Sequence, residues 1–351
     1  MDFEQDNNQS VPMGPQRSEP ASGLAASSPS VEPSRGGSGW RIFWGVVLVL
    51  SVMANIVLFL MLIGVLAMFT VGQRDLFAEE VIQEGPRRSK IAIVRVEGII
   101  DGMQAKNVSM QLKRARHDKR VKGLIIRVNS PGGTISGSDQ IYNEIRKYRQ
   151  EQDKPVIALM QGVAASGGYY TSVACEKIIA EPTTITGSIG VIFGHFVLQE
   201  LLENKLGIQP IIVTSGPKKG WPSMFKPFTE EQQRYVEERL INPAYERFVQ
   251  IVSDGRAELT LDEVKSLADG GIYGADEAVK EQLIDDVGYL DKAIEEIKKL
   301  SGVDKAQVVE YRRPFSLASF LYMRSQNILR FDKSMLYELS TPQVLYLWTV
   351  Y

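Results

Sequence analysis

A single serine lies among small residues in the run at positions 161–170, QGVAASGGYY. The run follows an aliphatic stretch, 155–160, that is typical of a buried strand. Small residues before Ser166 and two glycines after it allow a sharp turn into a helix, which predicts an exposed Ser166 at the helix N-terminus. This position suits a nucleophile, although a tight packing turn has the same composition and Ala164 departs from the G-x-S-x-G pattern.

A serine nucleophile needs a base that removes its proton, and the chain has two histidines. His117 follows two arginines at a predicted helix end, and His195 has aromatic neighbours, so surface or packing roles are favoured for both. Lysine acts as a base near neutral pH where burial disfavours its ammonium form. Lys218 and Lys219 lie in an apolar loop, 215–228, without an acidic residue, which fits such a base; a solvated basic loop is the alternative.

The negative charge that develops on a substrate carbonyl during acyl transfer is stabilised by backbone amides. Gly132 and Gly133 follow the predicted strand 123–128 almost directly. Amides of a glycine pair in this position can point at a carbonyl oxygen. The sequence therefore contains residues for a serine nucleophile, a lysine base and an oxyanion hole.

Four short motifs occur in a characteristic order. They are NSPGG (129–133), ASGGY (165–169), TGSIGV (186–191) and SGPKK (215–219). Their order and spacing resemble the signal peptide peptidase A (protease IV) family over residues 91–300. The resemblance implies an α/β, crotonase-like fold of repeated β-β-α units, which also occurs in the proteolytic subunit of Clp protease, and a Ser/Lys dyad without a cofactor or metal.

The resemblance also implies a role for each site residue. These are the nucleophile Ser166, the general base Lys219, Ser188, which would orient the lysine, and the oxyanion-hole amides of Gly133 and Gly167. The family's lysine lies three residues after a loop glycine, so Gly216 selects Lys219 over Lys218. The segment 220–225 departs from the family pattern, in which a small polar residue precedes Pro-Phe, and this change could alter substrate preference.

Five regions are predicted along the chain. They are a disordered polar tail (1–40), a transmembrane helix (41–73), a charged linker (74–90), a Ser/Lys peptidase domain (91–302) and a C-terminal extension (303–351). The uncharged run 42–73 exceeds the roughly 20 residues that span a bilayer, and the long polar tail before it favours an anchor over a cleaved signal peptide. Flanking positive charges mildly favour a cytoplasmic domain, whereas the resemblance implies a domain outside the cytoplasm.

The pattern within the domain alternates short aliphatic strands with amphipathic helices, which predicts an α/β fold. Strands are predicted at 91–96, 123–128, 155–160, 177–180 and 208–213. Helices are predicted at 108–116, 135–148, 196–203, 264–268, 275–282 and 290–300, with further helices that begin at Thr229 and Pro243. Thr229 with Gln232, and Thr260 with Glu263, have capping-box spacing.

Composition excludes several classes of protein. The chain is 44% hydrophobic and 23% charged, which indicates a globular protein, and its net charge of −2 without a basic stripe argues against nucleic acid as a partner. Cys175 is the one cysteine, so it has no cysteine partner for a disulfide or zinc site and is expected to be a packing residue.

The predicted function is a membrane-anchored serine endopeptidase that degrades hydrophobic peptides such as cleaved signal peptides. In two-repeat relatives the serine and lysine come from different repeats, so this chain, which resembles the single-repeat form, is expected to form a homo-oligomer with active sites at subunit interfaces. A crotonase-fold acyl-CoA enzyme and an inactive membrane scaffold are the alternatives.

The apolar tail 342–351 is expected to pack on its own domain or a membrane surface, or to pair as a strand in the peptidase groove.

Overall fold

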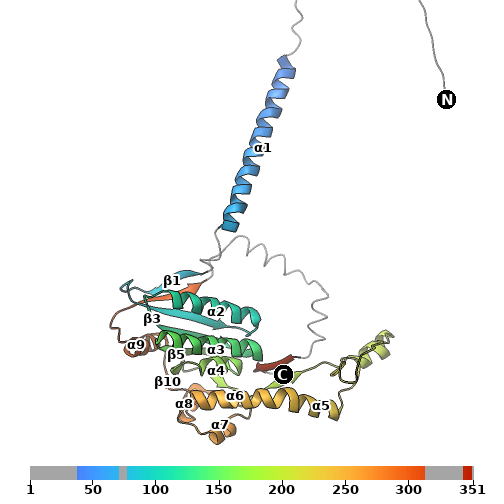
Figure 1. Cartoon of the computed structure of the whole chain (residues 1–351), viewed down its shortest axis with the longest axis vertical. Coiled ribbons are helices and arrows are strands. Elements are labelled where there is room, and N and C mark those ends of the chain that lie inside the picture. Colours follow the sequence, from blue (N-terminus) through green and yellow to red (C-terminus); the bar gives the residue numbers. More distant parts are fainter. Residues whose placement is uncertain (1–37, 71–76, 313–342, 350–351) are drawn as a thin grey trace, which may run out of the picture. The chain divides into compact units, whose positions relative to one another are not determined.

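The computed structural model describes residues 38–70, 77–312 and 343–349, in two compact units, 1–72 and 73–351. The first unit contains α1 (Ser38–Thr70), whose segment Gly39–Gly64 is long and apolar enough to cross a membrane (Figure 1). The predicted span 41–73 is helical over its described part, 41–70, and 71–73 lie outside the described residues. Most of the predicted polar tail, 1–37, lies outside the described residues.

A mainly parallel sheet forms the centre of the second unit (Figure 1). Its strands are β1 (Ala78–Gln83), β2 (Lys90–Glu97), β3 (Val121–Ser130), β5 (Val156–Ala165), β6 (Lys177–Ala180), β7 (Ile185–Gly187), β9 (Ile272–Gly274), β10 (Asp286–Val287) and β11 (Gln307–Arg312). The order is β1-β11-β2-β3-β5-β6-β10, and β7 joins β5 and β9. Among these described strands, β1 and β9 run antiparallel to their neighbours and the other pairs are parallel. The α/β prediction is confirmed.

A smaller, antiparallel sheet has the order β4-β12-β8. Its strands are β4 (Gly132–Thr134), β8 (Ile192–Gly194) and β12 (Gln343–Leu347). The central strand therefore comes from the C-terminal tail, whereas its two neighbours come from the middle of the chain.

Helices bury both faces of the main sheet, so its inner strands are nearly continuous apolar runs. The helices are α2 (Gly102–His117), α3 (Ile135–Gln152), α4 (Gly167–Ser172), α5 (Glu230–Val236), α6 (Asn242–Gly255), α7 (Leu261–Leu267), α8 (Ala275–Lys280) and α9 (Leu290–Ser301). Ile297 of α9 packs with Ile125 and Ile157 in one core cluster, whereas Leu112 of α2 and Phe248 of α6 belong to the other. This framework fixes the carboxyl ends of β3, β5 and β7, where the site motifs lie.

The sheet extends beyond the predicted domain 91–302 at both ends. The predicted linker contains β1, and the predicted extension contains β11, which lies between β1 and β2. One charge of the predicted linker is buried and paired, because Lys90 is 3% exposed and forms ion pairs with Glu79 and Asp118. Pairing between distant strands therefore outweighed the local polar composition.

The prediction of a strand at 208–213 is wrong, and the helix predicted at 196–203 is present but shifted to 199–206. A π-helical turn, η2 (Leu201–Lys205), follows two helical residues, and the chain from 207 to 214 is irregular. Ile211 and Val213 are 90% and 91% exposed, so this apolar run pairs with no described strand. A β-like composition alone does not form a strand without a neighbouring strand.

The N-termini of α5 and α7 agree with the capping residues predicted from the sequence. Both predicted capping boxes form, with Thr229 and Thr260 accepting hydrogen bonds from the amides of Gln232 and Glu263. Pro243 lies in the first turn of α6, which continues from a short π-helical segment, η3 (Glu237–Ile241).

We expect Arg256→Ala to lower the free energy of unfolding by about 2 to 4 kcal/mol. Arg256 is 8% exposed, donates to the Gln282 carbonyl at 2.8 Å and pairs with both Asp285 carboxylate oxygens. Its removal deprives the Gln282 carbonyl and Asp285 Oδ1 of this donor, whereas Asp285 Oδ2 keeps a hydrogen bond from the Ile178 amide. Urea unfolding in detergent measures the loss, and the exposed Arg239→Ala is the matched control, with a change below about 0.5 kcal/mol. Equal stability of the two variants would show that the Arg256 contacts contribute nothing.

Candidate active site

Ser166 lies at the junction of β5 and α4, as predicted. Its φ of 52° is in a region that side chains with a Cβ rarely adopt, and its amide donates to the Gly187 carbonyl at 2.7 Å. The prediction that Ser166 is exposed is wrong, because the residue is only 1% exposed. The backbone of the turn is therefore strained and buried, and its hydrogen bond to Gly187 joins it to the TGSIGV motif.

Ser188 is brought beside Ser166 by the pairing of β5 with β7. Ala165 is the register partner of Gly187, so the serines that follow them leave adjacent strands at the same end. Ser188 also has a positive φ, 49°, and its amide donates to the Gly271 carbonyl at 2.6 Å. Four non-glycine residues in the described chain have positive φ, and two of them are these serines. Paired backbone strain of this kind is typical of a functional site.

The glycines of two motifs meet next to these serines. A Cβ atom on Gly132, whose φ is 99°, would lie 2.0 Å from the Tyr346 carbonyl oxygen, and one on Gly133 would lie 2.1 Å from the Ile100 carbonyl oxygen. A Cβ atom on Gly167 would lie 3.1 Å from both the Gly132 Cα and the Tyr346 oxygen. Glycine is therefore required at these positions. Of the two predicted oxyanion-hole residues, Gly167 lies near the Tyr346 carbonyl oxygen and Gly133 is the register partner of Tyr346.

The strand of the C-terminal tail, β12, occupies the edge of β4. Tyr346 is the register partner of Gly133, and the Trp348 amide donates to the Pro131 carbonyl at 2.8 Å. The tail segment 343–347 therefore packs on its own domain, and it does so by pairing as a strand. An extended segment of polypeptide thus pairs with β4 beside the serine turn.

The described chain does not bring Lys219 to the serines. Lys219 is exposed in the loop after β8, and its amide donates to the Gly216 carbonyl at 3.0 Å. Lys218 instead lies over the ring of Tyr235, at 4.6 Å from the centroid. Within residues 38–70, 77–312 and 343–349, no hydrogen bond joins Lys219 to Ser166 or Ser188. Figure 1 shows the yellow-green segment between β8 and α5 extending away from the sheet.

Neither histidine replaces the lysine. His195 lies 6.4 Å from Phe193, ring to ring, in a stacked arrangement, which agrees with a packing role. His117 ends α2 among the basic residues of its last turn, which agrees with a surface role. The arrangement of the described residues therefore offers no Ser-His pair.

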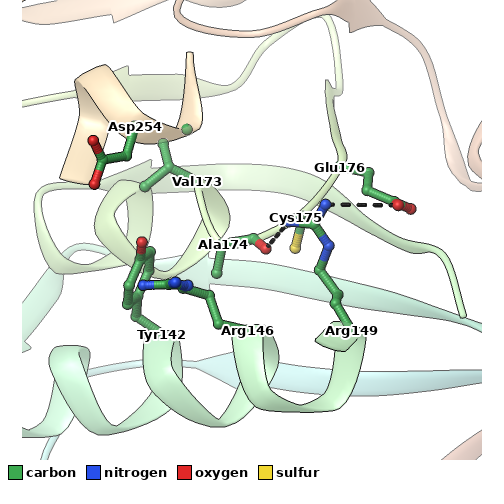
Figure 2. Close-up of a pocket in the computed structure, with 9 residues that line it drawn as sticks. Tyr142, Arg146, Arg149, Val173, Ala174, Cys175, Glu176 and Asp254 are labelled. Atoms are coloured by element: carbon green, nitrogen blue, oxygen red, sulfur yellow. Dashed lines mark hydrogen bonds and ion pairs between the residues drawn. The ribbon is translucent and has the colours of Figure 1, made fainter. Parts of the chain in front are cut away.

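A polar pocket of about 290 Å³ lies away from the serines, at the opposite end of α4 (Figure 2). Arg149 extends from α3 across the pocket, donates to the Ala174 carbonyl at 2.7 Å and lies 3.6 Å from the Glu176 carboxylate. Cys175 lines this pocket, and burial raises the pKa of its thiol to about 12. The thiol therefore stays protonated, as expected for a packing residue rather than a nucleophile.

The sequence did not point to the aromatic residues that surround β12. Tyr170 directly follows the serine motif, and Phe248 lies on α6, far along the chain. Both are fully buried against Tyr346, with ring centroids 5.0 and 4.8 Å away. No local pattern marks them, because the helices that carry them come together only in the fold.

Comparisons with known proteins agree with this arrangement. A family model described as peptidase family S49 matches residues 148–304, and one for Clp protease matches residues 80–184, in line with the expected crotonase/Clp-protease-like fold. A protein of Enterococcus faecium named as a signal peptide peptidase SppA is 38% identical over 245 residues, which cover 67% of this chain and 70% of that protein.

Two other relatives differ in length from this chain. A protein of Synechocystis sp. named as a protease is 35% identical over 63% of this chain and 78% of its own length. Protease 4 of Haemophilus influenzae is 37% identical over 60% of this chain, but the matched region is only 35% of that longer protein. Because the serine turn lies within residues 148–304, which the family model matches, and the Enterococcus protein is 38% identical over 70% of its own length, this chain belongs to peptidase family S49, the serine protease family of signal peptide peptidase A.

Proposed function

We propose that the chain is a membrane-anchored serine endopeptidase that uses Ser166 as nucleophile and Lys219 as general base. The observation that carries this proposal is the pairing of an extended segment, β12, with β4 beside the strained Ser166 turn. Proteases bind peptides by adding such a strand to a sheet edge, which holds successive carbonyl groups in a defined position.

In this mechanism the neutral amine of Lys219 takes the proton of Ser166 Oγ as the oxygen attacks the scissile carbonyl carbon. The amides of Gly133 and Gly167 stabilise the resulting oxyanion. The tetrahedral intermediate collapses when the leaving amine accepts the proton from the lysine ammonium. Water, deprotonated by Lys219, then hydrolyses the acyl-enzyme. Ser188, which follows β7 and lies next to Ser166, orients the lysine by a hydrogen bond.

A second copy of the chain supplies Lys219 to each Ser166 in this proposal. Within the described residues, the lysine loop is exposed and separate from the serines, and it follows an apolar segment, 196–213, with large exposed side chains. Exposed apolar runs of this kind are typical of protein interfaces. Head-to-tail contacts that close into a ring would bury the segment and place each lysine loop against a neighbour.

The anchor in this proposal is α1, with the peptidase domain outside the cytoplasm. Its segment Gly39–Gly64 has the length of a bilayer span and contains one charged residue, Arg41, near its start. Anchoring in one membrane plane would favour parallel association of the chains. It would also bring the site close to peptides that remain in the bilayer.

The substrates in this proposal are extended hydrophobic peptides such as cleaved signal peptides. We expect the full-length chain in detergent to cleave a signal-peptide core faster than a charged peptide of equal length, because a strand-binding site cannot accept folded protein. Mass spectrometry of both peptides, with a folded soluble protein as control, measures the preference. Preferred cleavage of the charged peptide would reject this substrate class.

A further inference from the structure

One side of the polar pocket in Figure 2 is cationic and belongs to α3. Tyr142, Arg146 and Arg149 line this side from successive turns of the helix. Arg149 is partly neutralised, because it donates to the Ala174 carbonyl and lies 3.6 Å from the Glu176 carboxylate. Arg146 instead lies over the ring of Tyr142, with its guanidinium carbon 5.7 Å from the ring centroid. Because like charges one helical turn apart repel each other, an anion beside the two arginines is favoured.

The other side of the pocket is anionic. Asp254 and Gly255 line it from the C-terminal turn of α6, and Figure 2 shows the Asp254 carboxylate across the pocket from α3. A helix C-terminus carries the negative end of the helix dipole, and no basic residue lies in this last turn to offset it. Gln250 donates to Asp254 Oδ1 at 2.7 Å, which holds the carboxylate in place. The carboxylate and the helix end therefore both favour a cation on this side.

The two facing charges are not neutralised by the chain that the structure describes. Among residues 38–70, 77–312 and 343–349, no ion pair joins Arg146 or Asp254 to an opposite charge. The Tyr142 hydroxyl is close to both of them: burial raises its pKa, an effect that Arg146 opposes and Asp254 strengthens. This hydroxyl therefore stays protonated and can donate to a ligand. The pocket offers donors at one side and an acceptor at the other.

The floor of the pocket is apolar and its volume is small. Val173, Ala174 and Cys175 form the floor after α4, and each is at most 5% exposed. Burial raises the pKa of the Cys175 thiol to about 12, so the floor adds no charge. The cavity of about 290 Å³ lies at the lower limit for small-molecule sites. A ligand here must therefore be smaller than a drug-sized molecule.

We infer that this pocket binds a small zwitterion of the amino-acid type, whose carboxylate contacts Arg146 and the Tyr142 hydroxyl and whose ammonium group contacts Asp254 at the end of α6. Free amino acids and dipeptides share this chemistry. The pocket lies at the opposite end of α4 from Ser166, so it is distinct from the proposed active site. The inference goes beyond the proposed peptidase function and does not depend on it.

Equilibrium dialysis tests whether both charges of the ligand are recognised. The full-length Ser166→Ala chain in detergent, which cannot consume a dipeptide by the proposed reaction, is dialysed at neutral pH against radiolabelled leucine. N-acetyl-leucine lacks the ammonium group and leucine amide lacks the carboxylate, so they are the matched ligands. We expect leucine to bind about tenfold more tightly than either derivative, because each loses one charge-assisted contact. Equal affinity for all three would overturn the zwitterion site.

Leucyl-leucine distinguishes the two sources of the zwitterion. Tighter binding of the dipeptide than of leucine would identify short peptides as the ligands, and the reverse would identify free amino acids. In both cases the preferred ligand should bind about tenfold more tightly than its own N-acetyl and amide derivatives. No binding of leucine or of leucyl-leucine at concentrations up to about 10 mM would overturn the inference.

Substitutions assign each ligand charge to its residue. Arg146→Gln should weaken leucine binding about tenfold and leave leucine amide unchanged, whereas Asp254→Asn should weaken leucine equally and leave N-acetyl-leucine unchanged. Lys147→Gln and Glu258→Gln are the matched controls, because both residues are exposed and neither lines the pocket. All four substituted residues are exposed, so thermal unfolding should not change. Equal leucine affinity in the Arg146→Gln, Asp254→Asn and control chains would place the ligand elsewhere and overturn the site.

Discussion

Ser166→Ala and Lys219→Ala are each expected to reduce peptide cleavage by about a thousandfold or more, while Lys218→Ala retains most of it. The first change removes the attacking oxygen and the second removes the base that accepts its proton. Lys218 is the matched control because it is adjacent, has the same charge and lies over the rings of Trp221 and Tyr235. Turnover by the native chain should rise with pH, since only the neutral amine accepts a proton.

A fluorophosphonate probe checks the same assignment without a peptide substrate. The probe should label Ser166 in the native chain, and labelling should be lost in Ser166→Ala and strongly reduced in Lys219→Ala. An inactive membrane scaffold would not be labelled at all. Retained labelling in Lys219→Ala, or equal losses in the Lys218→Ala and Lys219→Ala chains, would contradict the choice of base.

Mixing two inactive chains is expected to restore activity. If Lys219 of one chain serves Ser166 of its neighbour, co-expressed Ser166→Ala and Lys219→Ala chains assemble with some interfaces that carry both intact residues. Random assembly gives such an interface in about one quarter of cases, so recovery should approach that fraction of native activity. The measurement is peptide turnover by assemblies purified through different tags on the two chains.

The control for this experiment replaces one partner with a chain that carries both substitutions. Ser166→Ala co-expressed with Ser166→Ala/Lys219→Ala contains no intact serine, so it should remain inactive in every arrangement. Recovery in the first mixture and not in the second would place the dyad across an interface. No recovery in tagged assemblies that contain both chains would place both residues in one chain and require the exposed loop at Lys219 to move.

Several features were predictable because they depend on residues close together in the sequence. The turn at Ser166 needs small residues after a buried strand, and the capping boxes at Thr229 and Thr260 need only a spacing of three residues. The span within α1 follows from length and the near absence of charge. The ordered motifs also predicted the family correctly, because the spacing of several short motifs carries more information than any one of them.

Other features could not be predicted because their contacts join distant segments. A charged stretch became β1 only because β11 pairs with it, and an apolar run at 208–213 stayed irregular because no strand lies beside it. The small residues around Ser166 likewise predicted an exposed serine, but the residue is buried. Strand pairing depends on which edges the fold leaves available, which local composition does not specify.

The sequence by itself determined the chemical groups of this protein: a serine at a glycine-rich turn, a pair of adjacent lysines in an apolar loop, glycine pairs after buried strands, and an apolar helix near the N-terminus. Only the tertiary structure decided how these groups are arranged. It placed Ser188 beside Ser166 through the pairing of β5 with β7, left Lys219 exposed, and packed Tyr346 of the tail against Tyr170 and Phe248 beside the motif glycines. The physical reason is that residue type and spacing set local conformation, whereas sheet register and the packing of α3, α4 and α6 arise from contacts between segments far apart in the chain.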